Sequence, residues 1–163
     1  MRILGIDPGL KITGYGLIDC EKGPELKIKL IEAGTIEPKS RDLIQNKINK
    51  IYKNLDEIIV QYAPQTMVLE KLYSHYEHPT TACILGHVRG VICLLCAHRH
   101  IQLIEESVKR IRKAIVGNGN ATKLQTQRIV AHLLKIDETQ LTVDASDALA
   151  LAIGYVHQLR YQI

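Results

Sequence analysis

Apolar residues at the start of the chain form short runs that predict a β-hairpin. Residues 3–6 (ILGI) lead without a polar interruption into Asp7, and Pro8-Gly9 follows. A continuous apolar run is typical of a strand buried on both faces of a sheet. Residues 13–18 (TGYGLI) predict a second strand that pairs back antiparallel. The turn is expected to use the fixed φ of Pro8 and a positive φ at Gly9. Asp7 should therefore lie where a buried strand meets the surface, with small residues leaving bare backbone beside it.

The pattern after this hairpin predicts one more antiparallel strand and then strands that alternate with helices. Residues 27–35 alternate in part and predict the third strand. Apolar residues then recur every three or four positions over 44–62, which indicates an amphipathic helix with Ser40 as its N-cap and Pro64 beyond its end. The further elements are strands 66–70 and 101–104 and helices at about 81–98, at 121–135 with Asn120 as cap, and from Asp144 onward. This order indicates one α/β domain with a mixed sheet over residues 1–163.

The segment 81–98 is apolar around most of its predicted circumference, and it carries the small residues Gly86 and Gly90. A helix of this kind has two faces to bury. One is expected in the core and the other at a subunit interface, which predicts a dimer. His87 and Arg89 interrupt the apolar stretch, which argues against a membrane span.

Composition places the chain among soluble globular proteins, with 46% apolar and 23% charged residues among 163. Met1 leads directly into a strand, so we expect no signal peptide, a cytoplasmic location and reduced cysteines. Cys93 and Cys96 fall in an apolar helical run without a second CxxC, which favours buried core thiols over a redox pair or a zinc site that uses His98 or His100.

Four carboxylates stand at positions that a sheet edge could bring together. Asp7 and Glu70 each end an apolar strand, and Asp144 and Asp147 lie three residues apart at a helix start. Taken singly, each is ordinary turn or capping chemistry. Taken together, an all-oxygen cluster selects hard ions, Mg²⁺ or Mn²⁺. Two such ions about 3.5–4 Å apart can support in-line attack on a phosphodiester, one activating water and the other stabilising the leaving 3′ oxygen.

Charge and the surrounding basic residues favour a polyanionic substrate. The chain has 21 Lys and Arg against 17 Asp and Glu, and four acids gathered at a metal site would leave a more basic surface elsewhere. A basic run precedes the loop 117–120 (GNGN), which lacks the ending of a Walker A loop, and one lysine follows it. These cations are either a phosphate grip or a solvated charged face: Lys109, Arg110, Arg112, Lys113 and Lys123. Tyr73 and Tyr76 could stack on exposed bases or anchor their loop.

In this combination, the residues resemble the RuvC-type crossover junction endodeoxyribonucleases of bacteria. The resemblance rests on GIDPGLKITGYG at 5–16, VLEKLY at 68–73, LGHVRG at 85–90, VGNGNATK at 116–123 and DASDALALAI at 144–153. It implies an RNase H-like fold, a mixed five-stranded sheet flanked by helices. It also implies a homodimer that binds a four-way (Holliday) junction, nicks two opposed strands of like polarity to leave 5′ phosphate and 3′ hydroxyl ends, and works with the branch-migration proteins RuvA and RuvB.

The same resemblance assigns roles residue by residue. The four acids match metal-binding catalytic positions, which implies two Mg²⁺ ions per active site with Mn²⁺ as a substitute: Asp7, Glu70, Asp144 and Asp147. Tyr73 matches a position that engages bases near the junction centre. Arg112 and Lys123 match positions that contact the DNA backbone, and Lys109 and Lys113 are expected beside them. The preferred cleavage sequence, the division of ligands between two ions and a general-acid histidine stay open.

Three other interpretations compete with this one. A different RNase H-like nuclease, such as a YqgF-type protein, also opens with a GIDPG-like strand, but we do not associate it with the dimer helix or the DASDALA ending. An actin-like ATPase or sugar kinase carries a GIDxG hairpin but needs two such lobes and a longer chain. A junction-binding protein without activity would not be expected to keep all four acids.

Overall fold

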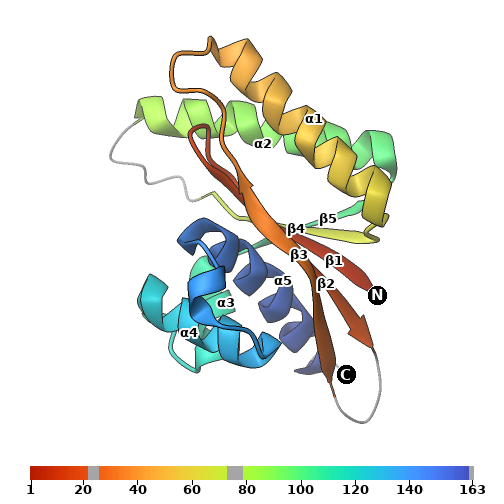
Figure 1. Cartoon of the computed structure of the whole chain (residues 1–163), viewed down its shortest axis with the longest axis vertical. Helices are drawn as coiled ribbons and strands as arrows, with labels where there is room; N and C mark the ends of the chain where they lie inside the picture. The colour runs from red at the N-terminus through yellow and green to blue at the C-terminus, as the bar shows by residue number, and fades with distance from the viewer. Residues whose placement is uncertain (22–25, 73–78, 162–163) are drawn as a thin grey trace.

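A computed structural model of the chain describes residues 1–21, 26–72 and 79–161, and it contains a five-stranded sheet between two layers of helices (Figure 1). The strands are β1 (Arg2–Asp7), β2 (Thr13–Glu21), β3 (Lys27–Ile36), β4 (Thr66–Glu70) and β5 (Gln102–Glu106). The helices are α1 (Ile44–Tyr62), α2 (Pro79–Arg99), α3 (Val108–Val116), α4 (Lys123–Leu134) and α5 (Val143–Tyr161), with a short 3₁₀ helix at Glu138–Gln140.

The sheet is mixed, with the strand order β3-β2-β1-β4-β5. The pairs β1–β2 and β2–β3 are antiparallel, whereas β4 runs parallel to both β1 and β5. Ile6 of β1 is in register with Leu69 of β4, so the next residue of each strand, Asp7 and Glu70, emerges at the same edge of the sheet. The predicted hairpin, the mixed sheet and the shared edge are confirmed.

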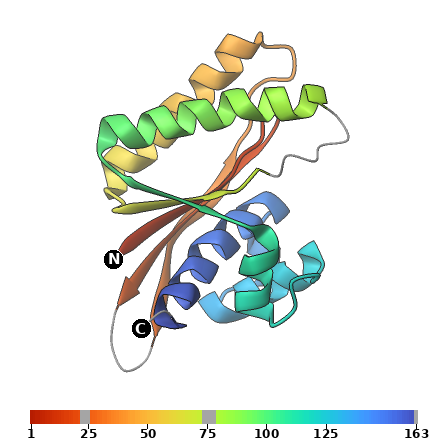
Figure 2. The same ribbon diagram turned by 180° about the vertical axis from the view of Figure 1, so that it is seen from behind.

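Both faces of the sheet are covered by helices, as the two opposite views show (Figures 1 and 2). Ile3 and Val68 pack with α3, α4 and α5 on one face. Leu4 and Ile6 pack with α1 and α2 on the other. Successive side chains of a strand point to opposite faces, so a strand with both faces covered has no place for a polar residue before its end. This explains why β1 is apolar from Ile3 to Ile6, between the charged residues at its two ends.

Close contact between α5 and the first hairpin brings the last two acids to the same edge. A Cβ atom on Gly5 would overlap the carbonyl oxygen of Ala148, and one on Gly14 would overlap that of Asp144. Because glycine has no Cβ, the helix backbone lies directly on β1 and β2. The small residues beside Asp7 therefore accommodate a helix, where the sequence suggested bare backbone for a ligand.

The turn after Asp7 differs from its prediction. Among the glycines that the structure describes, Gly117 alone has a positive φ, so Gly9 does not supply one. A Cβ atom on Gly9 would overlap the carbonyl oxygen of Ile12, so the turn requires glycine for space. Thr13 holds the turn, since its hydroxyl donates to the Gly9 carbonyl at 2.6 Å.

Three details of the helices also differ from prediction. Leu43, an apolar residue, takes the N-cap position of α1 in place of Ser40. Thr122 caps α4 in place of Asn120, because the hydroxyl of Thr122 and the side chain of Gln125 form a reciprocal capping box. The basic run before the Gly-Asn loop is itself a helix, α3, with Ser107 as its cap.

The helix α2 packs against the sheet through Val88, Ile92 and Leu95, which are fully buried. Among the described residues, only its stretch Thr80–Arg99 has the length and mean hydropathy, 1.7, that a membrane span needs, and a core helix meets the same test. Cys96 is buried as predicted, with its Sγ atom 3.4 Å from the Sδ atom of Met67. Cys93 is exposed, so the prediction of a buried thiol is wrong at that position.

Candidate active site

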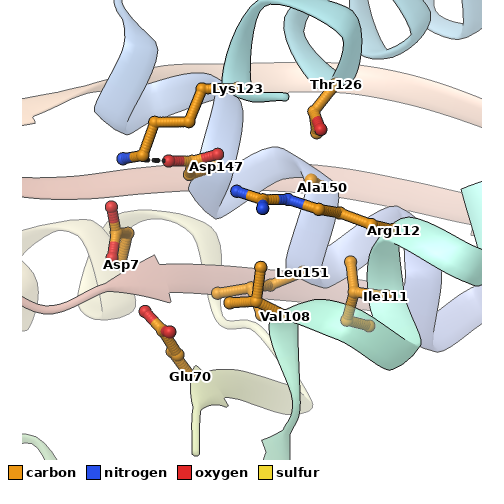
Figure 3. Close-up of a pocket in the computed structure, with 10 residues that line it drawn as sticks. All are labelled: Asp7, Glu70, Val108, Ile111, Arg112, Lys123, Thr126, Asp147, Ala150 and Leu151. Carbon is orange, nitrogen blue, oxygen red and sulfur yellow. Dashed lines mark ion pairs between the residues drawn. The ribbon is translucent and has the colours of Figure 1, made fainter. Parts of the chain in front are cut away.

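A cavity of about 310 Å³ opens beside the ends of β1 and β4 (Figure 3). It is lined by Asp7, Glu70, Val108, Ile111, Arg112, Lys123, Thr126, Asp147, Ala150 and Leu151. The lining combines acids at one end, two cations and an apolar wall from α3 and α5. It therefore contains three of the four predicted acids and both cations that the resemblance matched to DNA contacts.

Each acid in the cavity comes from a different element. Asp7 is the last residue of β1, Glu70 is the last residue of β4, and Asp147 lies one turn into α5. Figure 3 shows the three carboxylates pointing toward one another. Asp144 does not line the cavity, but it lies close enough for its charge to act on Asp7. The predicted convergence is confirmed for three acids, and Asp144 lies at the margin.

The cavity holds more negative charge than its surroundings compensate. Burial, followed by the charges of Glu70, Asp147 and Asp144, raises the pKa of Asp7 from its ordinary value of 3.8 to about 7, although Lys123 opposes the shift. Burial also raises the pKa of Glu70, while a hydrogen bond with Asp7 acts in the opposite direction. Buried carboxylates that repel one another hold their protons until a cation offsets the repulsion. Lys123 and Arg112 therefore neutralise the acids of this site only in part.

Lys123 is the cation in direct contact with the acids. Its Nζ atom lies 2.6 Å from an oxygen of Asp147 (Figure 3). Burial alone would lower the pKa of Lys123, but the contact with Asp147 and the charges of Asp7 and Asp144 raise it. Lys123 thus stays charged and occupies one side of the carboxylate cluster.

Arg112 supplies the second positive charge in the cavity. Its guanidinium group points between Asp147 and Glu70 in Figure 3, and its charge lowers the pKa of Glu70. Within the part of the chain that the structure describes, its buried Nε atom has no hydrogen-bond partner. A buried N–H group without an acceptor is costly, by about 1–3 kcal/mol. The side chain is therefore poised to donate to an oxygen that enters the cavity.

The other predicted DNA contacts lie outside the cavity or outside the described residues. Lys109 and Lys113 are exposed on α3. Tyr73 and Tyr76, together with His75, fall in the segment 73–78, which lies outside the described residues.

Some cavity residues were missed by sequence reasoning. Val108 and Ile111 of α3 face Ala150 and Leu151 of α5, and Thr126 is buried in α4. The available signal was helical spacing: Val108 lies four positions before Arg112, Ala150 and Leu151 lie three and four after Asp147, and Thr126 lies three after Lys123.

The donor set fits a hard divalent cation, because it consists of carboxylate oxygens alone. In residues 1–21, 26–72 and 79–161, however, no three His, Cys, Asp or Glu side chains lie as close as metal ligands do. Asp147 instead pairs with Lys123. An ion would therefore compete with Lys123 for Asp147.

Comparison with solved structures identifies the fold class. The fold matches a structure of Thermus thermophilus RuvC with a TM-score of 0.88 at 21% identity, covering 99% of this chain and 97% of that one. It also matches the yeast mitochondrial Holliday junction resolvase Ydc2, with a TM-score of 0.70 at 13% identity. These likenesses show the predicted RNase H-like fold, a mixed five-stranded sheet flanked by helices.

Comparison of sequences narrows this class to a family. The family model described as crossover junction endodeoxyribonuclease RuvC matches residues 3–155. A RuvC from Rhodopirellula baltica is 39% identical over 151 residues, 93% of this chain and 83% of the relative. A RuvC from Alkaliphilus metalliredigens is 35% identical over 162 residues, 99% of this chain and 96% of the relative. The chain belongs to the RuvC family of crossover junction endodeoxyribonucleases.

Proposed function

We propose that this protein is an endonuclease that resolves four-way (Holliday) DNA junctions by paired symmetric nicks, in homologous recombination and DNA repair. The observation that carries the proposal is the convergence of Asp7, Glu70 and Asp147 beside Lys123 and Arg112 in one cavity. Family membership supports it, as does the likeness to Thermus thermophilus RuvC bound to a Holliday junction substrate, with a TM-score of 0.88 at 19% identity. We further propose that residues 1–163 act as one domain.

Nucleases of this family depend on a divalent metal ion, and we propose Mg²⁺, two per site, with Mn²⁺ as a substitute. The residues that would hold it are Asp7, Glu70, Asp144 and Asp147. When bound, the metal supplies an activated water and stabilises the charge on the leaving 3′ oxygen. The acids bind and orient it, and the raised pKa of Asp7 means that this carboxyl must lose its proton first.

The cations of the site are proposed to bind the scissile phosphate. Arg112 has a buried donor without an acceptor, and Lys123 has its ammonium at the acids. Both would contact phosphate oxygens within the cavity, where an apolar wall limits screening by water. Lys109 and Lys113 are exposed on the same helix as Arg112 and would guide the flanking backbone. We keep Tyr73 as a proposed contact for bases near the junction centre.

A homodimer is proposed on the basis of α2. The face of this helix opposite Val88 and Ile92 includes exposed Leu94, at 50%, and the open surface of Gly86 and Gly90, where a Cβ atom would meet no atom within 4 Å. Small residues allow close approach of a second helix. A two-fold dimer would present one active site to each of two opposed strands of a junction.

Further partners and location follow from the same function. We propose that the enzyme works in the cytoplasm with the branch-migration proteins RuvA and RuvB, and that it requires no membrane.

The function is tested by incubating the protein with a labelled mobile four-way junction and with linear duplex, with and without Mg²⁺, and mapping the cuts. The expected result is a pair of symmetric nicks on the junction alone, in the presence of Mg²⁺, that leave ends which ligase can seal. Equal cutting of linear duplex would refute junction selectivity. Binding of the junction without any cleavage would favour the inactive binding protein.

A further inference from the structure

Arg89 is a buried charged residue on a helix that is otherwise apolar where it meets the sheet. Only 8% of the Arg89 surface is exposed to solvent. Among the described residues, the other buried charged residue is Glu106, which is also 8% exposed. Removing a guanidinium group from water is costly unless it is well paired. A buried guanidinium group therefore requires hydrogen-bond acceptors or a carboxylate beside it.

The partners of Arg89 lie at the ends of β4 and β5. One terminal nitrogen, Nη1, donates to the backbone carbonyl oxygen of Glu70, and the other, Nη2, donates to a carboxylate oxygen of Glu105. The two strands are parallel neighbours, with Leu69 in register with Glu105. Arg89 thus joins α2 to both strands at the edge where the acids emerge.

Glu70 is in register with Glu106 of β5, but it lies beyond the last pair of β1 and β4. Pairing between β1 and β4 ends at Ile6 and Leu69, one residue before Glu70. On the β5 side, the amide of Lys71 donates to the Glu106 carbonyl at 2.8 Å. The carbonyl of Glu70 is therefore held by Arg89 at the point where the chain leaves the sheet.

We propose that Arg89 is a positioning residue that fixes the backbone of Glu70 and so directs its carboxylate toward Asp7. The inference rests on the proposed function, because it assigns Glu70 to the metal-binding set. Arg89 itself lies outside the residues that line the cavity, so it acts through Glu70 and does not contact the reacting atoms.

Arg2 provides a matched control at the opposite end of the sheet. Its Nη1 atom donates to the carbonyl oxygen of Tyr62 at 2.6 Å, and its Nη2 atom lies 2.8 Å from a carboxylate oxygen of Asp19. The chemistry is the same as that of Arg89, a backbone carbonyl and a carboxylate held by one guanidinium. Arg2 begins β1, whereas Asp7 ends it. Loss of Arg2 should therefore affect stability without affecting the site.

The test compares Arg89→Gln, Arg89→Lys and Arg2→Gln with the unmodified protein in two measurements. The first is binding of Mn²⁺ to the DNA-free protein, followed by electron paramagnetic resonance. The second is single-turnover cleavage at saturating junction, together with junction affinity in Ca²⁺. Loss of a group that orients a ligand typically costs 10–100-fold in metal affinity or activity. We expect Arg89→Gln to lose at least about tenfold in Mn²⁺ affinity and in the rate of junction cleavage, while its junction affinity stays unchanged. Arg89→Lys should lose less in both Mn²⁺ affinity and cleavage rate.

Arg2→Gln should match the unmodified protein in both measurements, even if its melting temperature falls. If Arg89→Gln binds Mn²⁺ and cleaves as Arg2→Gln does, the proposal is overturned. If Arg89→Gln fails to fold, the test rests on Arg89→Lys, whose single ammonium group cannot reproduce both contacts of the guanidinium group. Full Mn²⁺ affinity in Arg89→Lys would also overturn the proposal. Failure of the unmodified protein to cleave junctions would instead refute the proposed function, which separates the two outcomes.

Discussion

At the scale of single residues, the site is defined by the electrostatic cost of bringing acids together. Asp7 illustrates this, since burial and three neighbouring carboxylates raise its pKa to about 7. Lys123 offsets only part of the repulsion. A cation that binds between these carboxylates would offset their repulsion, so cation binding should stabilise the folded protein.

This charge arrangement predicts how stability of the metal-free protein depends on pH. The folded protein retains the Asp7 proton to a higher pH than the unfolded chain, so the associated stability is present below about pH 4 and is lost as pH rises through about 7. We expect the melting temperature in chelator to fall between pH 5 and pH 8. Asp7→Asn, which stays neutral, should flatten this fall and be more stable at pH 8 by about 2 kcal/mol, or several degrees. Differential scanning fluorimetry measures both.

Added Mg²⁺ should raise the melting temperature of the unmodified protein more at pH 8 than at pH 6, because Asp7, whose pKa is about 7, has lost its proton at pH 8. If the melting temperature of Asp7→Asn falls with pH as steeply as that of the unmodified protein, titration of Asp7 does not cause the loss of stability.

At the scale of elements, the position of α5 on the first hairpin decides where the acids lie. The helix can approach β1 and β2 because Gly5 and Gly14 present no Cβ atom to it. Asp147 reaches the cavity only in this arrangement, since it extends from the helix toward the end of β1 (Figure 3).

Replacing Gly5 by alanine should therefore displace α5. The new methyl group would overlap the Ala148 carbonyl oxygen, which belongs to the helix backbone and cannot rotate away. We expect a loss of about 1–3 kcal/mol in the free energy of unfolding, measured by urea denaturation, together with weaker Mg²⁺ binding. Val60→Ala is the control, because Val60 is 62% exposed on α1, outside both the site and the proposed interface, and alanine favours helices. Equal stability of Gly5→Ala and Val60→Ala would contradict the close packing described here.

Many of the helices and strands, and the sheet edge that carries the acids, could be predicted from the sequence. The elements and contacts that were not predicted have physical explanations. The run of residues 3–6 and the acids that end apolar strands predicted the sheet edge, because a strand buried on both faces tolerates no earlier polar residue. The helix α3 was not predicted, because its basic residues were interpreted as a phosphate-binding run and the helical spacing of Val108, Ile111 and Ile115 was overlooked. Asn120 and Thr122 both suit an N-cap, and the Gln125 side chain decided between them. The partner of Arg89 depends on tertiary contact, which no local pattern reveals.

At the scale of the whole molecule, the two helical layers on either side of the sheet (Figures 1 and 2) have different roles. The layer of α3, α4 and α5 contributes most of the cavity lining, whereas α2 in the other layer exposes Leu94, Gly86 and Gly90. A second copy of the chain on that face would place two active sites in one assembly, as a junction with two-fold symmetry requires.

The dimer predicts a mass of twice 18.3 kDa in sedimentation equilibrium at micromolar concentration. Leu94→Glu would place a charge within the proposed interface and should lower the mass to that of one chain. Val60→Glu changes a residue that is 62% exposed on α1, and it should leave the dimer intact. A mass near one chain for the unmodified protein would argue against α2 as the interface.

The account depends most directly on Asp7, and one comparison tests it: single-turnover cleavage of a four-way junction by the unmodified protein, Asp7→Asn and Asp19→Asn in Mg²⁺. Asp19 pairs with Arg2 and serves as the control, because Arg2 lies at the far end of β1 from the acids. We expect Asp7→Asn to bind the junction with unchanged or higher affinity and to lose cleavage by at least about a thousandfold, since it removes a metal ligand and not a DNA contact. Asp19→Asn should cleave normally. Cleavage by Asp7→Asn at the rate of Asp19→Asn would contradict the account.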